Sequence, residues 1–162
     1  EATEVLNAVL DGGVNLIDTS PDYGPSEELI GGAIAGRRAE YVLATKVGCP
    51  VATEAGSGHV YTRENIVAAV EQSLRRMRTD HLDVVQFHGS PSKATLEEHD
   101  ALGVLRELQQ QGKVRFFGMS GTIPNLAKFG AFVDVGDGME GMIHIGDLSS
   151  ERRIMRLVPS SR

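Results

Sequence analysis

The sequence predicts an α/β fold of parallel strands alternating with helices, followed by a β-hairpin. Two observations predict the first part: four apolar runs each end in a reactive or polar residue, and helix-like segments separate them. Strands that alternate with helices lie parallel, so their carboxyl ends open on one face. The hairpin rests on a third observation, which is that alternation with a period of two replaces the helical period after Asn125. It is predicted over residues 129–145 with its turn at residues 136–138, and the alternative is a further strand paired in parallel with residues 114–120.

The four apolar runs place their last residues where a site could form. The runs are VNLID, YVLATK, LDVVQFH and VRFFGMS, and they end at Asp18, Lys46, His88 and Ser120. Tyr23 lies just past the first run, in the segment DTSPDYG, and can join them. A packed core has no reason to hold an acid, a lysine and a histidine at these places, whereas a site that reduces a carbonyl group has one.

Helices are predicted between the runs from capping residues and apolar spacing. The first helix spans residues 2–10, and the chain begins inside it. Apolar residues at positions 66, 70, 74 and 77 make one stripe along a later helix. The predicted helix signals are Ser26 as the cap of residues 27–35, Thr62 as the cap of residues 63–78, a capping box of Thr95 with Glu98, and Gly112 at the end of the last helix.

The charge of the chain argues against a general attraction to nucleic acid. The formal net charge is −6, and it belongs to the first 127 residues, because acidic and basic residues balance from Lys128 onward. An acidic body does not attract nucleic acid without a local basic patch. No apolar run approaches the length that a membrane-spanning helix needs, so no membrane partner is predicted.

Cysteine and histidine usage predicts neither disulfides nor a metal site. Cys49 is the only cysteine, which excludes a disulfide framework within the chain and fits a reducing cytoplasm. No base partner for it is visible in the sequence, so it is interpreted as a small packing residue. The histidines His59, His81 and His99 are scattered, match no ligand spacing and are interpreted as surface or loop residues.

The segments DTSPDYG, ATKVG, VVQFH and GMSG, in this order, resemble the aldo-keto reductase family over residues 1–127. The resemblance implies a (β/α) barrel of the TIM type. A complete barrel takes about 250 residues, so a chain of 162 residues is expected to hold only part of one. The chain also opens without methionine, and we interpret it as a fragment or a fusion.

The resemblance implies reduction of an aldehyde or ketone with NADPH, and it assigns a role to each of four residues. Tyr23 is the proton donor, and because a free tyrosine has a pKa of about 10, it needs a nearby cation. Lys46 supplies that cation, Asp18 holds Lys46 in place, and His88 donates a hydrogen bond to the substrate carbonyl. The alternative interpretation is a structural ion pair between Asp18 and Lys46, with His88 as a core histidine.

Ser120 is the candidate contact to the nicotinamide carboxamide. Many members of the family have asparagine at the next position, where this chain has Gly121. The alternative for Ser120 is a helix cap or an ordinary loop serine. The family holds the cofactor phosphates mainly with its C-terminal strands and loops, which are not recognisable in this sequence.

Residues 128–149 resemble part of the OB-fold RNA-binding domain of ribosomal protein S1, which carries a similar FGAFV and GMEGMIHI core on consecutive strands. The resemblance implies a base-stacking surface at Phe129, Phe132 and His144; ordinary core packing of the phenylalanines is the alternative. Residues 150–162 are interpreted as a basic tail. The alternatives to a reductase fragment are therefore an RNA-binding module and an inactive fragment or fusion.

Overall fold

The chain folds around a four-stranded parallel sheet. The structure is a computed structural model that describes residues 1–51, 58–121, 131–134 and 140–143. The strands pair in the order β1-β2-β3-β4, and all three pairs are parallel, as predicted. The strands are β1 (Leu16–Asp18), β2 (Val42–Val47), β3 (Leu82–Phe87) and β4 (Val114–Met119).

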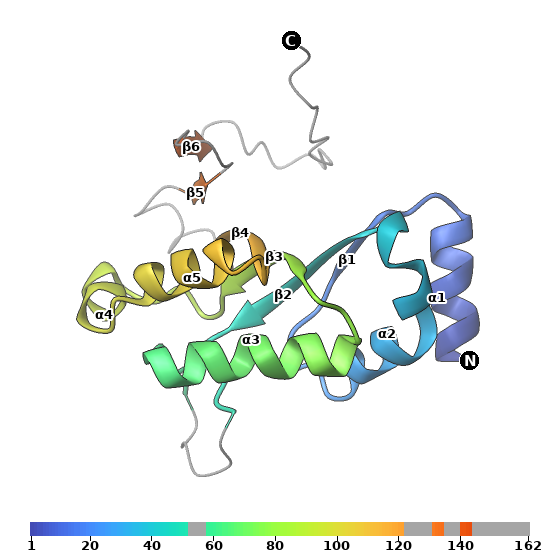
Figure 1. Ribbon diagram of the computed structural model, residues 1–162, viewed down its shortest axis with the longest axis horizontal. Coiled ribbons are helices and arrows are strands. Elements are labelled where there is room, and N and C mark those ends of the chain that lie inside the picture. The colour runs from blue at the N-terminus through green and yellow to red at the C-terminus, as the bar shows by residue number, and fades with distance from the viewer. Residues whose placement is uncertain (52–57, 122–130, 135–139, 144–162) are drawn as a thin grey trace.

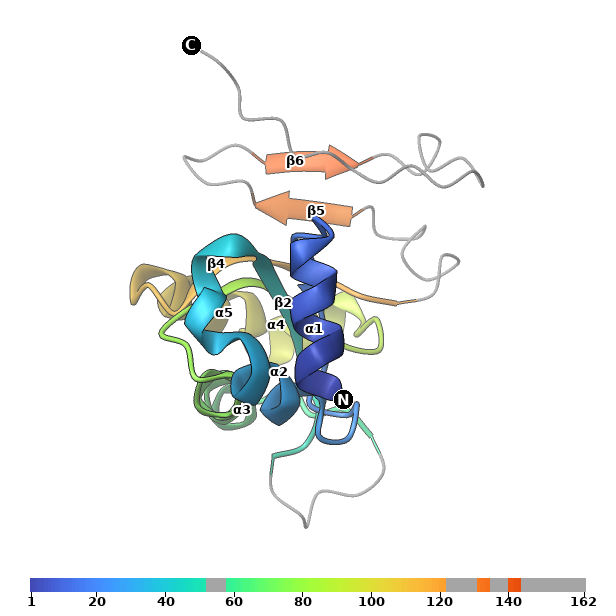
Figure 2. The ribbon, with the colours of Figure 1, turned by 90° about the vertical axis from the view of Figure 1, so that its right-hand side faces the viewer.

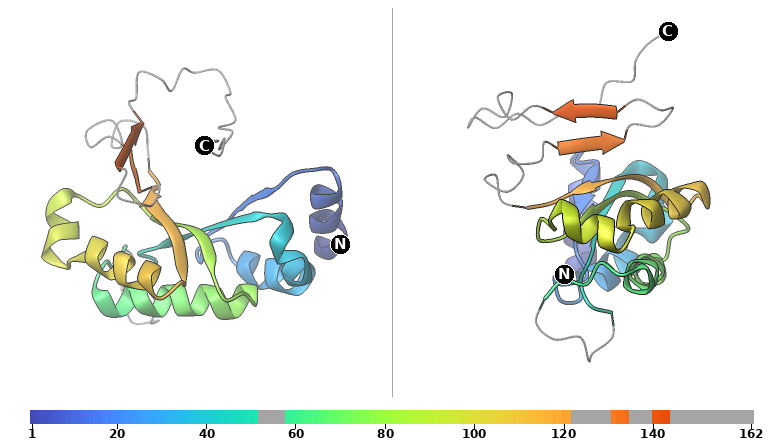
Figure 3. Two further views of the ribbon diagram at one scale, coloured as in Figure 1. Left: turned by 45° about the horizontal axis from the view of Figure 1, so that its top comes forward. Right: turned by 90° about the vertical axis from the view of Figure 1, so that its left-hand side faces the viewer.

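Helices separate the strands and lie along one face of the curved sheet (Figures 1 and 3). This arrangement is that of part of a (β/α) barrel, in which helices surround the sheet. No helix in the described part of the chain is long and apolar enough to cross a membrane. The helices are α1 (Ala2–Asp11), α2 (Ser26–Ile34), the 3-10 helix η1 (Ala35–Glu40), α3 (Arg63–Met77), α4 (Lys93–Glu98) and α5 (Ala101–Gln110).

The strand register brings the carboxyl ends of the strands to one edge. Asp18 lies opposite Ala44, and Lys46 lies opposite Gln86. The backbone N–H of His88 donates to the carbonyl of Val47 at 2.9 Å, which extends the ladder by one residue. Polar side chains that end different strands are therefore held within reach of one another.

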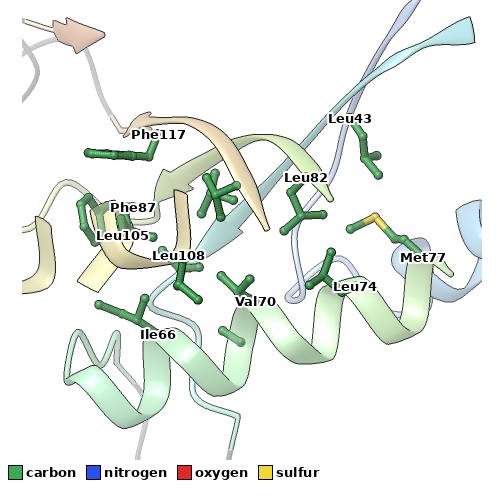
Figure 4. Close-up of a cluster of buried hydrophobic side chains, with 14 of the residues drawn as sticks. Leu43, Ile66, Val70, Leu74, Met77, Leu82, Phe87, Leu105, Leu108 and Phe117 are labelled. Carbon is green, nitrogen blue, oxygen red and sulfur yellow. The ribbon is translucent and has the colours of Figure 1, made fainter. Parts of the chain in front are cut away.

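The core lies between the sheet and helices α3 and α5 (Figure 4). The predicted stripe on α3 is confirmed, because Ile66, Val70, Leu74 and Met77 are all buried and face the strands. Burial of these side chains fixes the rotation of α3 against the sheet. The strands and α5 contribute further buried side chains, among them Leu43, Leu82, Phe87, Leu105, Leu108 and Phe117.

Two predicted caps are confirmed and two are wrong. Thr62 caps α3, where its hydroxyl accepts a hydrogen bond from the Asn65 N–H at 3.4 Å. Gly112 follows α5 with a φ of 76°, a conformation that favours glycine. Ser26 is not a cap, because α2 already begins at Ser26, where the Pro25 carbonyl accepts the first helical hydrogen bond from the Leu29 N–H. The Ser26 hydroxyl instead accepts a hydrogen bond from the Thr19 hydroxyl.

The capping box of Thr95 with Glu98 is the second wrong prediction. The true cap of α4 is Ser92, whose hydroxyl accepts from the Thr95 N–H at 3.1 Å. The chain then leaves helical geometry at Asp100, which has a φ of 46°, and α5 starts at the next residue. The sequence pattern merged two helices because the apolar spacing continues across this break.

A separate two-stranded antiparallel sheet follows the parallel one (Figure 2). It consists of β5 (Ala131–Asp134) and β6 (Glu140–Ile143), which pair antiparallel. The predicted hairpin is therefore confirmed against the alternative of a further parallel strand beside β4. The predicted turn at residues 136–138, the candidate RNA-contacting residues Phe129 and His144, and the tail at 150–162 lie outside the described residues.

The close approach of α2 to α3 predicts opposite effects for two neighbouring glycines. A Cβ at Gly31 would lie 2.1 Å from the Arg76 carbonyl oxygen, whereas a Cβ at Gly32 would meet nothing within 4 Å. Gly31→Ala should therefore destabilise the fold by about 3 kcal/mol, because backbone must shift. Gly32→Ala should stabilise it by about 0.5–1 kcal/mol, since alanine favours a helix interior. Urea unfolding midpoints check both, and equal midpoints for the two variants would contradict the packing.

Candidate active site

An ion pair between β1 and β2 forms the centre of the candidate site. The Lys46 side chain is only 3% exposed, and its Nζ donates to Asp18 Oδ2 at 2.9 Å, to Asp18 Oδ1 at 3.1 Å and to the Thr19 carbonyl at 2.8 Å. A buried ammonium needs such partners, because an unpaired charge away from water is costly. The position of the Lys46 charge is thereby fixed at the carboxyl edge of the sheet.

Tyr23 lies next to this ammonium. The centroid of the Tyr23 ring is 5.3 Å from Lys46 Nζ, and Tyr23 is half exposed. The turn that carries it is closed by two backbone hydrogen bonds, from the Tyr23 N–H to Ser20 and from the Ser26 N–H to Tyr23. The phenol is thus held on the same side of the sheet as Lys46, with its ring accessible from outside.

His88 completes the group of residues singled out in the sequence. Its ring lies 6.3 Å from the Tyr23 ring, edge to face, and its Nδ1 lies 3.3 Å from Asp22 Oδ2. Burial and the neighbouring His59 lower the pKa of His88, although Asp22 opposes the shift. The imidazole is therefore neutral near pH 7 and has one N–H to donate.

Gln86 belongs to the same surface, and sequence analysis missed it. Its Nε2 lies 3.4 Å from Asp18 Oδ1, and its backbone is opposite Lys46 in the sheet. The signal was available, because alternate residues of a strand face the same side and Gln86 is two residues before His88. Gln86 can help to orient the Asp18 carboxylate toward Lys46.

Cys49 is buried and His59 is an exposed loop residue, as predicted, but both have neighbours that the sequence does not reveal. Cys49 has a base partner after all, since its Sγ lies 3.3 Å from His88 Nδ1. The His59 ring centroid lies 4.9 Å from that of His88, so this exposed loop histidine reaches the predicted site. The Val60 N–H donates to the Gly48 carbonyl at 2.7 Å, and this bond brings the two ends of the intervening loop together. Sequence spacing alone does not reveal such a closure.

The Cys49 thiol is not set up as a nucleophile. Its burial, together with a hydrogen bond to Asp22, raises the pKa of Cys49 to about 12. The thiolate is the reactive form of cysteine, so this thiol is unreactive at neutral pH. The group formed by Asp22, Cys49, His59 and His88 is nevertheless a concentration of polar side chains beside the predicted site.

Ser120 lies at the end of β4, at the same edge of the sheet. Its N–H donates to the Phe87 carbonyl at 2.9 Å, and its carbonyl accepts from the Ser90 N–H at 3.2 Å. A Cβ at Gly121 would lie 1.4 Å from Ser90 Oγ, so a larger residue would displace the Ser90 side chain. The Ser90 side chain can therefore keep this position only because residue 121 is glycine.

Comparison with known proteins identifies two families that this chain resembles. The model of the aldo/keto reductase family matches residues 1–128, and that of the S1 RNA binding domain matches residues 118–160. Among curated proteins, the uncharacterized oxidoreductase YqkF of Bacillus subtilis is 35% identical over 133 residues, covering 79% of this chain and 42% of that protein. The aldo-keto reductase YhdN of the same organism is 40% identical over 121 residues, covering 72% of this chain and 36% of that protein.

A solved structure gives the same result at the level of the fold. The holo form of aldo-keto reductase AKR11C1 from Bacillus halodurans superposes with a TM-score of 0.67 at 33% identity, covering 78% of this chain and 43% of that one. The chain thus spans well under half the length of the relatives described here. With its parallel sheet, its buried lysine and a family match over most of its length, the chain belongs to the aldo-keto reductase family.

Proposed function

We propose that this chain carries the proton-transfer half of an NADPH-dependent reductase site for aldehydes or ketones. The observation that carries the proposal is the Lys46 ammonium, which is buried, held by Asp18 and placed 5.3 Å from the centroid of the Tyr23 ring. Two of the three residues come from different strands and the third from a loop, so a purely local structural reason does not account for their meeting. Reducing conditions such as those of the cytoplasm suit the buried thiol of Cys49.

Each of the four residues has a distinct part in the proposed chemistry. Tyr23 gives its phenolic proton to the oxygen of the substrate carbonyl, and the Lys46 charge stabilises the phenolate that results. Asp18 holds Lys46 in place through two hydrogen bonds. Neutral His88 donates a hydrogen bond to the same carbonyl oxygen and favours negative charge on it.

The residues at this edge fit the nicotinamide end of the cofactor better than its phosphates. When bound, NADPH supplies the hydride. Ser120 follows β4 at the edge of the sheet where its hydroxyl would reach the carboxamide, next to β3, which His88 follows. The described residues of the edge contribute one lysine to this site, and Asp18 neutralises it, so tight binding of a phosphate needs further positive charge.

The isolated chain is expected to oxidise NADPH with an aromatic aldehyde at a rate close to the uncatalysed background. Hydride transfer depends on accurate placement of the nicotinamide, and this chain spans only 36% of YhdN. Joining residues 1–119 to the part of YhdN that follows the matched segment should restore aldehyde-dependent turnover, measured as loss of NADPH absorbance. A chimera that folds and binds NADPH yet shows no turnover would contradict the proposed function.

A second candidate function is binding of single-stranded RNA by the C-terminal segment. The match of residues 118–160 to the S1 RNA binding domain favours it, together with the antiparallel pairing of β5 and β6. Aromatic side chains such as Phe132 would stack on bases. Titration of a labelled oligouridylate at two salt concentrations tests this, with Phe132→Ala as the variant. Binding that is absent at low salt, or that Phe132→Ala leaves unchanged, would contradict it.

A further inference from the structure

Four side chains that each offer one metal-ligating atom converge at the carboxyl edge of the sheet. They are Asp22, Cys49, His59 and His88, and one ligand atom from each lies within 4.8 Å of the other three. Asp22 comes from the loop after β1, Cys49 and His59 from the loop after β2, and His88 from the end of β3. Three parts of the chain must therefore fold correctly before the four atoms can meet.

The separations between these atoms suit a four-coordinate ion. Zinc bonds of about 2.0–2.3 Å at tetrahedral angles place ligand atoms roughly 3.4–3.7 Å apart. His88 Nδ1 already lies 3.3 Å from Asp22 Oδ2 and 3.3 Å from Cys49 Sγ. All the other separations in the group are within 4.8 Å, and two of the four side chains, those of Asp22 and His59, are exposed.

The surroundings allow an ion to enter and hold two of its ligands in place. Cys49 is 2% exposed and lies at the base of the group, whereas Asp22 and His59 are exposed at its rim. The Asp22 N–H donates to Ser20 Oγ at 3.3 Å, and the His59 ring stacks on Tyr61 with 6.1 Å between centroids. Such outer contacts orient ligands before the ion arrives.

We propose that Asp22, Cys49, His59 and His88 bind a divalent cation of the zinc class. A thiolate and two imidazoles are ligands that zinc favours, whereas calcium and magnesium favour sites made of oxygen atoms. On binding, the thiol of Cys49 gives up its proton to solvent and a bond forms between its sulfur and the ion. The proposal does not depend on hydride transfer, since it concerns binding alone.

The test is a titration of the reduced, metal-free chain of 162 residues with Zn²⁺ and with Co²⁺. Calorimetry should give one Zn²⁺ per chain, and Zn²⁺ should raise the thermal unfolding midpoint, because it binds the folded state. Co²⁺ should produce the near-ultraviolet absorption band of a cobalt–thiolate bond. Cys49→Ser should remove that band, and His59→Gln should weaken Zn²⁺ binding by at least about tenfold.

His99→Gln is the matched control, because it removes a histidine outside the group and should leave both signals unchanged. His59→Gln changes an exposed side chain, so it decides the question even where Cys49→Ser fails to fold. Absence of binding by the unaltered chain would overturn the proposal and leave the group as a hydrogen-bonded network. Binding that His59→Gln weakens no more than His99→Gln does would also overturn it, since the ion would then lie elsewhere.

Discussion

Tyr23→Phe should lower kcat for aldehyde reduction by about 10²- to 10⁴-fold in the chimera of this chain with the C-terminal part of YhdN. The change removes one oxygen atom, and with it the proton that the substrate oxygen would receive. The Tyr23 ring stays in place beside Lys46, so KM should change little. Steady-state kinetics at saturating NADPH measures the effect.

Tyr41→Phe is the matched control for this prediction. The Tyr41 hydroxyl also donates a hydrogen bond, to the Ile34 carbonyl at 3.4 Å, but the residue is buried at the opposite end of β2. Its loss should lower stability by about 1 kcal/mol and leave kcat unchanged. Equal loss of kcat in both variants would show that a phenolic proton at position 23 has no special part in the reaction.

The parts of the fold that sequence predicts well are those that one repeating physical rule governs. Each apolar run became a strand. The physical rule is clearest for β2, where five of six residues are buried, because a strand buried on both faces reads as a continuous apolar run; β1 is largely exposed. Parallel pairing then brings the ends of the strands together, which is why Asp18 and Lys46 could be expected to meet. The hairpin of β5 and β6 was likewise predictable from alternation around a glycine-rich segment.

Features that depend on three-dimensional packing were harder to predict. Glu27 stands in the first turn of α2, where an acid favours the helix dipole, and nothing in the sequence marks it as buried. In the structure it is fully buried and accepts hydrogen bonds from Thr45 Oγ1 at 2.8 Å and Ser73 Oγ at 2.7 Å, with Arg76 as its ion partner. Those donors come from β2 and α3, which only the tertiary fold brings to α2.

The group around His88 was missed for the same reason. Nine residues lie between Cys49 and His59, and nothing in their spacing shows that the loop returns to its starting point. The return depends on the hydrogen bond between Val60 and Gly48. A metal-ligand motif is recognisable in a sequence when its ligands are a few residues apart, whereas these ligands are related only through the sheet.

The largest expected effect on stability comes from a second buried carboxylate, at the amino end of β3. The Asp83 side chain is 5% exposed; its Oδ2 accepts from Arg38 Nη2 at 2.5 Å and from the Leu43 N–H at 2.8 Å. Arg115 also pairs with Asp83 but is 59% exposed, so water screens that interaction and its contribution is small. Asp83 therefore connects β2, β3 and η1 through one group.

Asp83→Ala should destabilise the chain by about 3–5 kcal/mol. Removing the carboxylate leaves the Leu43 N–H without its acceptor. The partly buried Arg38 guanidinium also loses its ion partner. Whole domains are stable by only about 5–15 kcal/mol, so the variant should be largely unfolded at a temperature where the unaltered chain is folded. Urea unfolding followed by circular dichroism measures the difference. Asp80→Ala, at an exposed carboxylate three residues away, is the control and should leave the midpoint close to that of the unaltered chain.

The loss of stability in Asp83→Ala should also depend on pH. The hydrogen bonds that Asp83 accepts determine whether this loss grows or shrinks as the pH falls. Burial raises the pKa of Asp83, but the hydrogen bonds from Leu43, Arg38 and Arg115 outweigh burial and lower the pKa below its ordinary value. A carboxyl group whose pKa is lower in the folded state stabilises the fold above its unfolded pKa of about 3.9, and that stabilisation is lost as the pH falls through the folded pKa. The difference in unfolding free energy between the unaltered chain and Asp83→Ala should therefore be constant from pH 7 to about pH 5 and shrink at lower pH. A difference that grows as the pH falls would mean that Asp83 is destabilised in its ionised form, and that the donors from Leu43 and Arg38 do not compensate for its burial.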